Sequence, residues 1–301
     1  MMNGGSVPRF MAIERIAVIG AGQMGNGIAQ VAATSGFEVV MIDINQEAVD
    51  RGMATIERSL SKLVQKERLS QEDADAARAR LSVSTDRSPC AEADLVVEAV
   101  PEILSLKKSI FEDLDGICGP DTILASNTSS ISITRLAAQT RHPENFIGMH
   151  FMNPVPVMQL VELIRGMATS DESFEKAQAI VKTLGKTAAV SEDYPAFIVN
   201  RILLPMINEA AFALYEGVGT VASIDEAMQL GANHRMGPLQ LADFIGLDTC
   251  VSIMRVLQDG LGDDKYRPCP LLVKYVEAGW LGRKSGRGFY DYGGDKPVPT
   301  R

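Results

Sequence analysis

The chain has 301 residues, 46% hydrophobic and 22% charged, which is enough for one large or two ordinary globular domains with a substantial core. The net charge of −9 argues against DNA or RNA as the main partner, because nucleic acids need a basic face. No uninterrupted apolar run reaches the roughly 18 residues of a membrane-spanning helix, so we expect no membrane span.

Residues 1–12 contain no charged segment followed by an apolar run, so they indicate a flexible tail and no secretory signal. The four cysteines form no CxxC pair and show no zinc-like spacing. They predict reduced thiols in a cytoplasmic protein and no metal site.

A strand–helix–strand unit follows the tail. The run "RIAVIGAG" (15–22) is short, apolar and ends in glycines, which predicts a buried strand and a turn. The segment "MGNGIAQVAATSG" (24–36) predicts a helix closed by Gly36, and "EVVMID" (38–43) predicts a second buried strand. This order within about 30 residues is typical of a parallel sheet.

Strands and helices continue to alternate up to residue 191. A long polar segment (46–80) has apolar residues at helical spacing, and short apolar runs predict strands further along. These strands are expected over 81–85, 93–100, 122–127, 146–151, 159–164 and 187–191. We therefore predict a Rossmann-type, doubly wound α/β domain over residues 1–191.

Beyond residue 192 the sequence shows no convincing strand. The segment 196–217 is apolar nearly all round and predicts a buried helix, and 239–262 and 270–280 predict further helices. We therefore predict an all-helical C-terminal domain over 192–301. Its apolar surface exceeds what one layer of helices can cover, so we assign it to substrate binding and to formation of a homodimer.

The segment "GAGQMG" matches the pattern GxGxxG at Gly20, Gly22 and Gly25, between a predicted strand and a predicted helix. The first glycine permits the tight turn, the second lets backbone approach a pyrophosphate, and the third lets the helix lie close to the sheet. The helix N-terminus offers N–H groups and a positive dipole end to the phosphates. We therefore expect a dinucleotide at this loop, which also contains Gln23 and Met24.

Asp43 ends the second predicted strand. A carboxylate at this place can accept hydrogen bonds from the ribose hydroxyls of a dinucleotide and would repel a 2′-phosphate, which favours NAD over NADP. A turn-forming glycine cluster with a strand-end acid and no ligand remains the alternative.

One histidine and one glutamate interrupt the largely apolar stretch "GMHFMNPVPVMQLVELI" (148–164). A dehydrogenase of alcohols needs a base for the hydroxyl proton, and histidine titrates near neutral pH. A carboxylate on the other ring nitrogen would orient the imidazole and stabilise its protonated form. His150 ends one predicted strand, Glu162 lies in the next, and a turn at residues 153–156 could bring them together. From these residues alone, a structural histidine at the rim of the core remains the more common interpretation.

Seven segments, in this order, resemble the 3-hydroxyacyl-CoA dehydrogenases: "VIGAGQMGNGIA", "VVEAV", "SNTSS", "HFMNPVPVMQLVE", "FIVNRILLP", "MGPLQLADFIGLDT" and "GRKSGRGFYDY". The resemblance extends from about residue 13 to residue 292. It implies a reversible, NAD-dependent oxidation of (S)-3-hydroxyacyl-CoA to 3-ketoacyl-CoA. A short-chain substrate such as 3-hydroxybutyryl-CoA and a homodimer are also implied.

The resemblance implies roles for individual residues. His150 matches the catalytic base, and Glu162 matches its charge-stabilising partner. Ser129 matches the serine that touches the reacting oxygen and the nicotinamide end, and Asn200 matches the asparagine that holds the reactive end of the substrate. The remaining residues matched on the cofactor side are Glu102, Lys107, Asn127, Asn153 and Lys284.

Ser59 and Lys66 match the helical residues that meet coenzyme A. They are two helical turns apart and so share a face, where a lysine can pair with a phosphate. Without the resemblance, a solvated charged face would be the ordinary interpretation. The family often has glycine where this chain has Ala196, from which we expect a backbone angle compatible with alanine.

Two other functions remain open. One is a dehydrogenase of a free 3-hydroxy compound, of the carnitine or gulonate type, and the other is a non-catalytic NAD-binding protein. Ser59 and Lys66 favour a CoA substrate, and His150 with Glu162 favours catalysis. We expect the site in a cleft between the two domains. No residue that we identify sets the acyl chain length or the pathway, which could be fatty acid β-oxidation, butanoate metabolism or aromatic-acid degradation.

Overall fold

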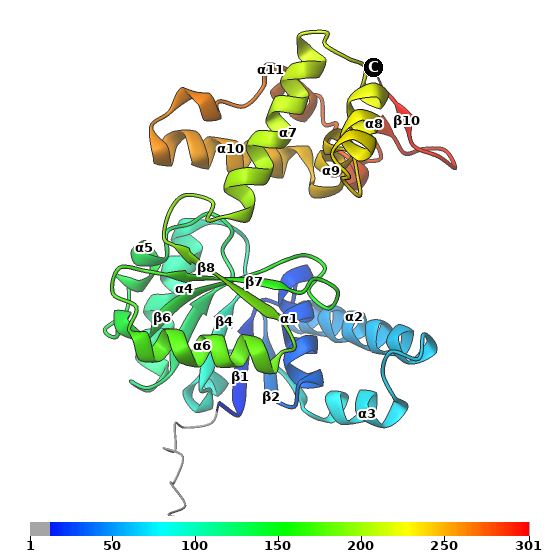
Figure 1. The fold of residues 1–301 in the computed structure, drawn as a ribbon. Helices are drawn as coiled ribbons and strands as arrows, with labels where there is room; N and C mark the ends of the chain where they lie inside the picture. Colours follow the sequence, from blue (N-terminus) through cyan, green and yellow to red (C-terminus); the bar gives the residue numbers. More distant parts are fainter. Residues whose placement is uncertain (1–12, 301) are drawn as a thin grey trace, which may run out of the picture. The chain divides into compact units, whose positions relative to one another are not determined.

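The computed structural model of the chain describes residues 13–300, so the expected tail over 1–12 lies outside the described residues. The chain divides between Asp193 and Tyr194 into a unit that contains a large sheet and a helical unit (Figure 1). The boundary predicted from the sequence lies after residue 191. No helix within 13–300 is both long and apolar enough to cross a membrane.

An eight-stranded sheet forms the centre of the first unit (Figure 1). Its order is β3-β2-β1-β4-β5-β6-β7-β8, and every neighbouring pair is parallel except β6 with β7, which are antiparallel. This confirms the predicted doubly wound α/β fold. The strands are β1 (Arg15–Ile19), β2 (Glu38–Ile42), β3 (Leu81–Ser84), β4 (Leu95–Glu98), β5 (Ile123–Ser126), β6 (Phe146–Phe151), β7 (Leu160–Arg165) and β8 (Thr187–Glu192).

The central strands are buried on both faces, which explains why their sequences are nearly continuous apolar runs. Among the helices, α1 contacts α2 and α3, whereas α4 contacts α5. The helices of this unit are α1 (Gln23–Thr34), α2 (Gln46–Gln65), α3 (Gln71–Ala79), α4 (Leu104–Ile117), α5 (Ile133–Ala137) and α6 (Asp171–Thr183), with short 3-10 helices η1 (Ser88–Glu92) and η2 (Pro143–Asn145).

The second unit is mostly helical, as predicted (Figure 1). Its elements are α7 (Val199–Tyr215), α8 (Val221–Gly231), α9 (Pro238–Ile245), α10 (Leu247–Leu261), α11 (Pro270–Glu277), η3 (Asp264–Tyr266), η4 (Arg283–Ser285), β9 (Tyr290–Asp291) and β10 (Val298–Pro299). The expectation of no strand beyond residue 192 is wrong for β9 and β10, which pair with each other. Two residues per strand are too few for a recognisable alternating pattern.

The prediction of a buried helix over residues 196–217 is wrong for one face of α7. Leu204 and Ile207 are buried in the core of the helical unit. On the opposite side, Ile202 is 68% exposed, and Tyr215, the last residue of the helix, is 54% exposed. A helix that is apolar nearly all round therefore presents an uncovered apolar face.

Two buried aspartates hold the C-terminal segment against the helices. Asp243 accepts hydrogen bonds from the backbone N–H groups of Phe289 and Tyr290, both at 2.9 Å. Asp225 accepts from the backbone N–H of Leu239 and from the Tyr290 hydroxyl, both at 2.8 Å. Burial raises the pKa of both carboxyl groups despite these hydrogen bonds. Their contribution to stability is therefore greatest at acidic pH and declines as the pH rises through the folded-state pKa.

All four cysteines are free, as their spacing predicted. Burial raises the pKa of the Cys90 thiol to about 12 and that of Cys250 to about 12. These two thiols are accordingly protonated and poorly reactive at neutral pH.

Ala196 does not have the alanine-compatible backbone angle that we expected. Its φ is +62°, in the left-handed region that favours glycine, and its side chain is fully buried. The glycine common at this place in the family would fit the observed backbone, and the alanine is accommodated at a steric cost.

We predict that Ala196→Gly changes the free energy of unfolding by less than about 0.5 kcal/mol, because relief of the left-handed strain offsets the lost methyl burial and the added chain entropy. Ala211→Gly is the matched control, since Ala211 is equally buried within α7. It should cost about 1.5–2 kcal/mol, because helix propensity and burial are both lost. Urea titration measures the free energy of unfolding of each variant. Equal losses of this free energy in the two variants would contradict the backbone strain at Ala196.

Candidate functional site

A cavity of about 1230 Å³ opens at the carboxyl ends of β1, β2 and β4, and the glycine loop lines one side of it. Gly20 has φ +105°, and a Cβ there would lie 2.6 Å from the Ala99 carbonyl oxygen. A Cβ on Gly25 would lie 1.7 Å from the Gly20 carbonyl oxygen, so only glycine lets α1 begin this close to β1. A Cβ on Gly22 would meet nothing within 4 Å. The loop thus combines a tight turn, close packing and a backbone that faces open space, which fits a dinucleotide pyrophosphate.

Asp43 also lines this cavity, directly after β2. Its carboxylate accepts hydrogen bonds from the backbone N–H groups of Ala21 and Ile44, both at 2.7 Å. The acid is therefore held against the glycine loop, at the place where the fold presents a ribose-binding acid.

Gln23 joins the glycine loop to the turn that follows β6. Its side-chain amide donates to the Asn153 side-chain oxygen at 3.1 Å. Met24 is partly buried and packs against the core of the first unit. Gln23 and Asn153, both expected near the cofactor, are thus brought together, and Met24 supports the loop from the core side.

The antiparallel pairing of β6 with β7 places His150 opposite Glu162. His150 Nδ1 lies 2.7 Å from Glu162 Oε2. The glutamate is fully buried and the histidine is 7% exposed. A carboxylate at Nδ1 favours the tautomer with the proton on that nitrogen, which makes Nε2 the basic one. The turn between the two strands therefore brings the two residues together.

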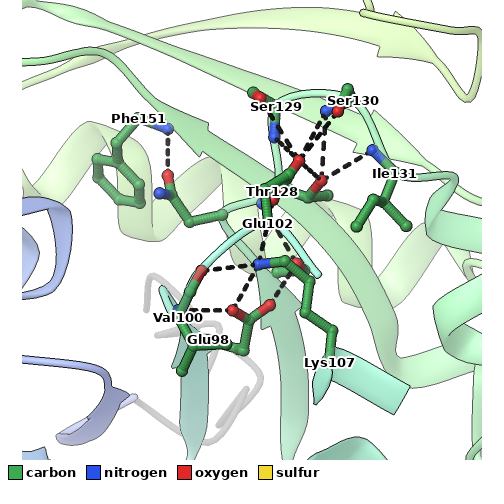
Figure 2. Close-up of polar contacts among 11 residues, drawn as sticks. Glu98, Val100, Glu102, Lys107, Thr128, Ser129, Ser130, Ile131 and Phe151 are labelled. Atoms are coloured by element: carbon green, nitrogen blue, oxygen red, sulfur yellow. Dashed lines mark hydrogen bonds and ion pairs between the residues drawn. The ribbon is translucent and has the colours of Figure 1, made fainter. Parts of the chain in front are cut away.

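The end of β5 is tied to β6 beside this pair. The Asn127 side-chain oxygen accepts a hydrogen bond from the Phe151 backbone N–H at 2.8 Å (Figure 2). The Asn127 backbone N–H in turn donates to the Glu98 carbonyl oxygen at 2.8 Å. Asn127 thus fixes the backbone that follows His150.

Glu102 holds the loop that carries Ser129 (Figure 2). Its Oε1 accepts hydrogen bonds from the backbone N–H groups of Ser129 at 2.9 Å and Ser130 at 3.2 Å, and from the Thr128 hydroxyl. Partial burial acts to raise the pKa of Glu102, but the Lys107 ammonium and these hydrogen bonds hold it below its usual value. The carboxylate is therefore ionised at neutral pH, and its interactions weaken only in acid.

Lys107 is 1% exposed, and the protein itself surrounds its ammonium group with acceptors. The Nζ atom lies 2.6 Å from Glu98 Oε1, 3.2 Å from the Val100 carbonyl oxygen and 3.3 Å from Glu102 Oε2 (Figure 2). Glu98 is not among the site residues predicted from the sequence. The signal that could have found it is the single acid in the apolar strand "LVVE", the same kind of signal that His150 and Glu162 show.

The other residues that the family resemblance implies lie on α2, α7 and η4. Ser59 is half-buried in α2. Lys66, which caps the C-terminus of this helix, is exposed. Asn200 lies in the first turn of α7. Lys284 lies in η4, where its Nζ is 2.6 Å from Asp248 Oδ1. Asn200 and Lys284 belong to the helical unit.

Comparison with known proteins identifies relatives along nearly the whole chain. The "3-hydroxyacyl-CoA dehydrogenase, NAD binding domain" family matches residues 15–194, and the C-terminal domain of the same family matches residues 197–292. A 3-hydroxybutyryl-CoA dehydrogenase of Bradyrhizobium diazoefficiens is 62% identical over 96% of this chain and 99% of its own length. A probable 3-hydroxybutyryl-CoA dehydrogenase of Bacillus subtilis is 56% identical over 94% of this chain and 98% of its own.

Solved structures agree with this relationship. The crystal structure of (S)-3-hydroxybutyryl-CoA dehydrogenase from Ralstonia eutropha has a TM-score of 0.92 and 51% identity, covering 94% of this chain and 100% of that one. The cavity at the glycine loop lies within the part of the chain that matches the NAD-binding domain. The chain therefore belongs to the 3-hydroxyacyl-CoA dehydrogenase family, with its NAD-binding domain in the first unit and its C-terminal domain in the second.

Proposed function

We propose that the chain is an NAD-dependent dehydrogenase that interconverts (S)-3-hydroxyacyl-CoA and 3-ketoacyl-CoA, with 3-hydroxybutyryl-CoA as the preferred substrate. The proposal rests on the buried pair formed by His150 and Glu162, which lies in the same unit as the NAD-binding loop. The names of the similar proteins support the substrate, since both relatives described above are 3-hydroxybutyryl-CoA dehydrogenases or probable ones.

Bound NAD supplies a hydride acceptor for C3 of the substrate. His150 accepts the proton of the 3-hydroxyl group on Nε2 in the oxidation direction and returns it in the reduction direction. Glu162 holds the Nδ1–H and stabilises the charge that develops on the ring. Because Glu162 is fully buried and its strand is paired with β6, the imidazole keeps one orientation throughout.

Ser129 orients the reacting oxygen beside His150. Its backbone is anchored by Glu102, so the position of the hydroxyl does not depend on a mobile loop. Asn127 and Asn153 keep the backbone and the turn near His150 in place. For Asn200 and Lys284 of the helical unit, the family resemblance supports roles in holding the substrate and the cofactor, respectively.

Coenzyme A binds along α2. Lys66 is exposed at the end of this helix, where an ammonium group can pair with a phosphate of the coenzyme, and Ser59 lies two turns earlier on the same face.

The helical unit forms the contact between two copies of the chain. Ile202 and Phe212 of α7 line an open depression together with charged residues, among them Arg201, Glu209 and Arg267. Subunit interfaces commonly combine exposed apolar side chains with polar ones around them.

We predict that His150→Gln lowers kcat for acetoacetyl-CoA reduction by about 10³-fold with NADH binding retained, because the proton donor is lost. His142→Gln is the matched control, since His142 is exposed and also has a glutamate within 3.1 Å of its ring. It should leave kcat unchanged. Steady-state kinetics with NADH absorbance measure both variants, and kcat within twofold of wild type for His150→Gln would refute the proposed base.

The CoA moiety should be required for efficient turnover. We predict that kcat/KM for acetoacetyl-CoA exceeds that for free acetoacetate by at least about 100-fold, since binding energy from the distant part of a substrate supports catalysis. Lys66→Ala should raise KM for acetoacetyl-CoA several-fold, whereas Lys62→Ala, one turn earlier, should not. Equal activity on the free acid would favour a dehydrogenase of free 3-hydroxy compounds.

The chain should sediment as a dimer, and Ile202→Asp should convert it to a monomer, because a charge in the centre of an apolar interface is left without a partner. Met167→Asp is the control, since Met167 is 91% exposed in the first unit. Analytical ultracentrifugation over a range of concentrations decides the question. A wild-type monomer at all concentrations would rule out the interface.

A further inference from the structure

Glu98 is a buried acid that has no role in the proposed mechanism. We infer that Glu98 is a positioning residue of the site: it fixes the Lys107 ammonium, and this leaves Glu102 turned toward the loop that carries Ser129. The inference rests on the proposed function only for the role of Ser129 in catalysis.

The Glu98 carboxylate has no access to solvent, and both of its oxygens accept hydrogen bonds within the protein. Oε1 accepts from the Val100 backbone N–H at 2.7 Å and from Lys107 Nζ at 2.6 Å. Oε2 accepts from the Ser126 hydroxyl at 2.7 Å. One side chain at the end of β4 therefore holds β5 and α4 (Figure 2).

The position of Lys107 follows from this carboxylate. A buried ammonium group requires an anionic partner, and the shorter of its two ion pairs is with Glu98, at 2.6 Å. The second carboxylate, Glu102, is 3.3 Å away and 36% exposed. The two acids thus share one lysine unequally, and Glu98 makes the shorter and more buried ion pair.

Because Glu98 holds Lys107, Oε1 of Glu102 is available to accept hydrogen bonds from the loop that carries Ser129. While Oε2 faces Lys107, Oε1 accepts from the backbone N–H groups of Ser129 and Ser130 (Figure 2). If Glu98 were neutral, Lys107 would have Glu102 as its only anionic partner within 4 Å among the described residues, and Glu102 would be drawn inward. The hydrogen bonds to the loop would then lengthen.

Ser126 adds a second route from Glu98 to the same loop. The Ser126 hydroxyl donates to Glu98 and accepts from the Thr128 backbone N–H at 3.2 Å. Thr128 in turn donates its hydroxyl to Glu102 and accepts from the backbone N–H of Ile131 at 2.8 Å. The loop is therefore held along two routes, one through Ser126 and one through Lys107 and Glu102, and Glu98 is the group that the two routes share.

The test is Glu98→Gln in the full-length chain, which keeps the shape and removes the charge. We expect backbone amides in a peptide spanning residues 127–131 to exchange with deuterium about tenfold faster than in the wild type, because the loop opens more often. We also expect kcat for acetoacetyl-CoA reduction, expressed per NADH-binding site, to fall by about tenfold or more, because Ser129 is displaced. Counting NADH-binding sites removes any effect of unfolded protein.

Glu92→Gln is the matched control. Glu92 lies in η1, shortly before β4, and pairs at the exposed surface with Arg15. It makes the same chemical change without touching the network and should leave exchange over 127–131 and kcat at the wild-type values. The inference is overturned if Glu98→Gln behaves as this control does in either measurement.

A second variant covers the case in which Glu98→Gln does not fold. The double variant Glu98→Gln/Lys107→Met removes both buried charges, so no ammonium group is left unpaired. We expect it to fold and to show the same fast exchange over 127–131. Wild-type exchange in the double variant would overturn the inference. If the wild-type protein does not reduce acetoacetyl-CoA, the proposed function fails, and the exchange rates alone decide the role of Glu98.

Discussion

The antiparallel pairing of β6 with β7 is the constraint on which the site depends. All other neighbouring strands of the large sheet run parallel, so this reversal is the step that sets a residue of one strand directly opposite a residue of the next after a short turn. Here the facing residues are His150 and Glu162, and backbone hydrogen bonds fix their separation. The contact between the His150 imidazole and the Glu162 carboxylate thus follows from the register of the two strands. Neither side chain depends on a flexible loop for its position.

A second pair of buried polar residues lies on directly opposite positions of two neighbouring strands, β4 and β5. Glu98 and Ser126 are register partners of β4 and β5, and their side chains are hydrogen-bonded at 2.7 Å. Both pairs are polar groups inserted into strands that are otherwise apolar, and all four side chains are buried. Buried polar groups of this kind are costly unless each is satisfied, and here each one has a partner that also fixes a part of the site. The sheet therefore supplies rigid support both for His150 and for the loop that carries Ser129.

Much of the fold could be predicted from the sequence because its signals are local. Apolar runs ending in glycine indicate buried strands, and the spacing of the glycine loop indicates its turn. The contacts of Glu98 with Lys107 could not be predicted, because they depend on how α4 is rotated against β4. The resemblance implied that Lys107 lies near the cofactor, but only the folded chain shows that its ammonium is surrounded by protein acceptors. The backbone angle of Ala196 and the exposed face of α7 also escaped prediction, because both are set by packing beyond the segment itself.

The central claim is that His150 Nε2 exchanges a proton with the 3-oxygen of a 3-hydroxyacyl-CoA. A crystal structure of the protein with NAD and acetoacetyl-CoA tests it most directly. The account predicts that the 3-oxygen lies about 2.6–3.2 Å from His150 Nε2 while Nδ1 remains bonded to Glu162. A complex in which another side chain occupies that distance, or in which the substrate binds away from His150, would contradict the account.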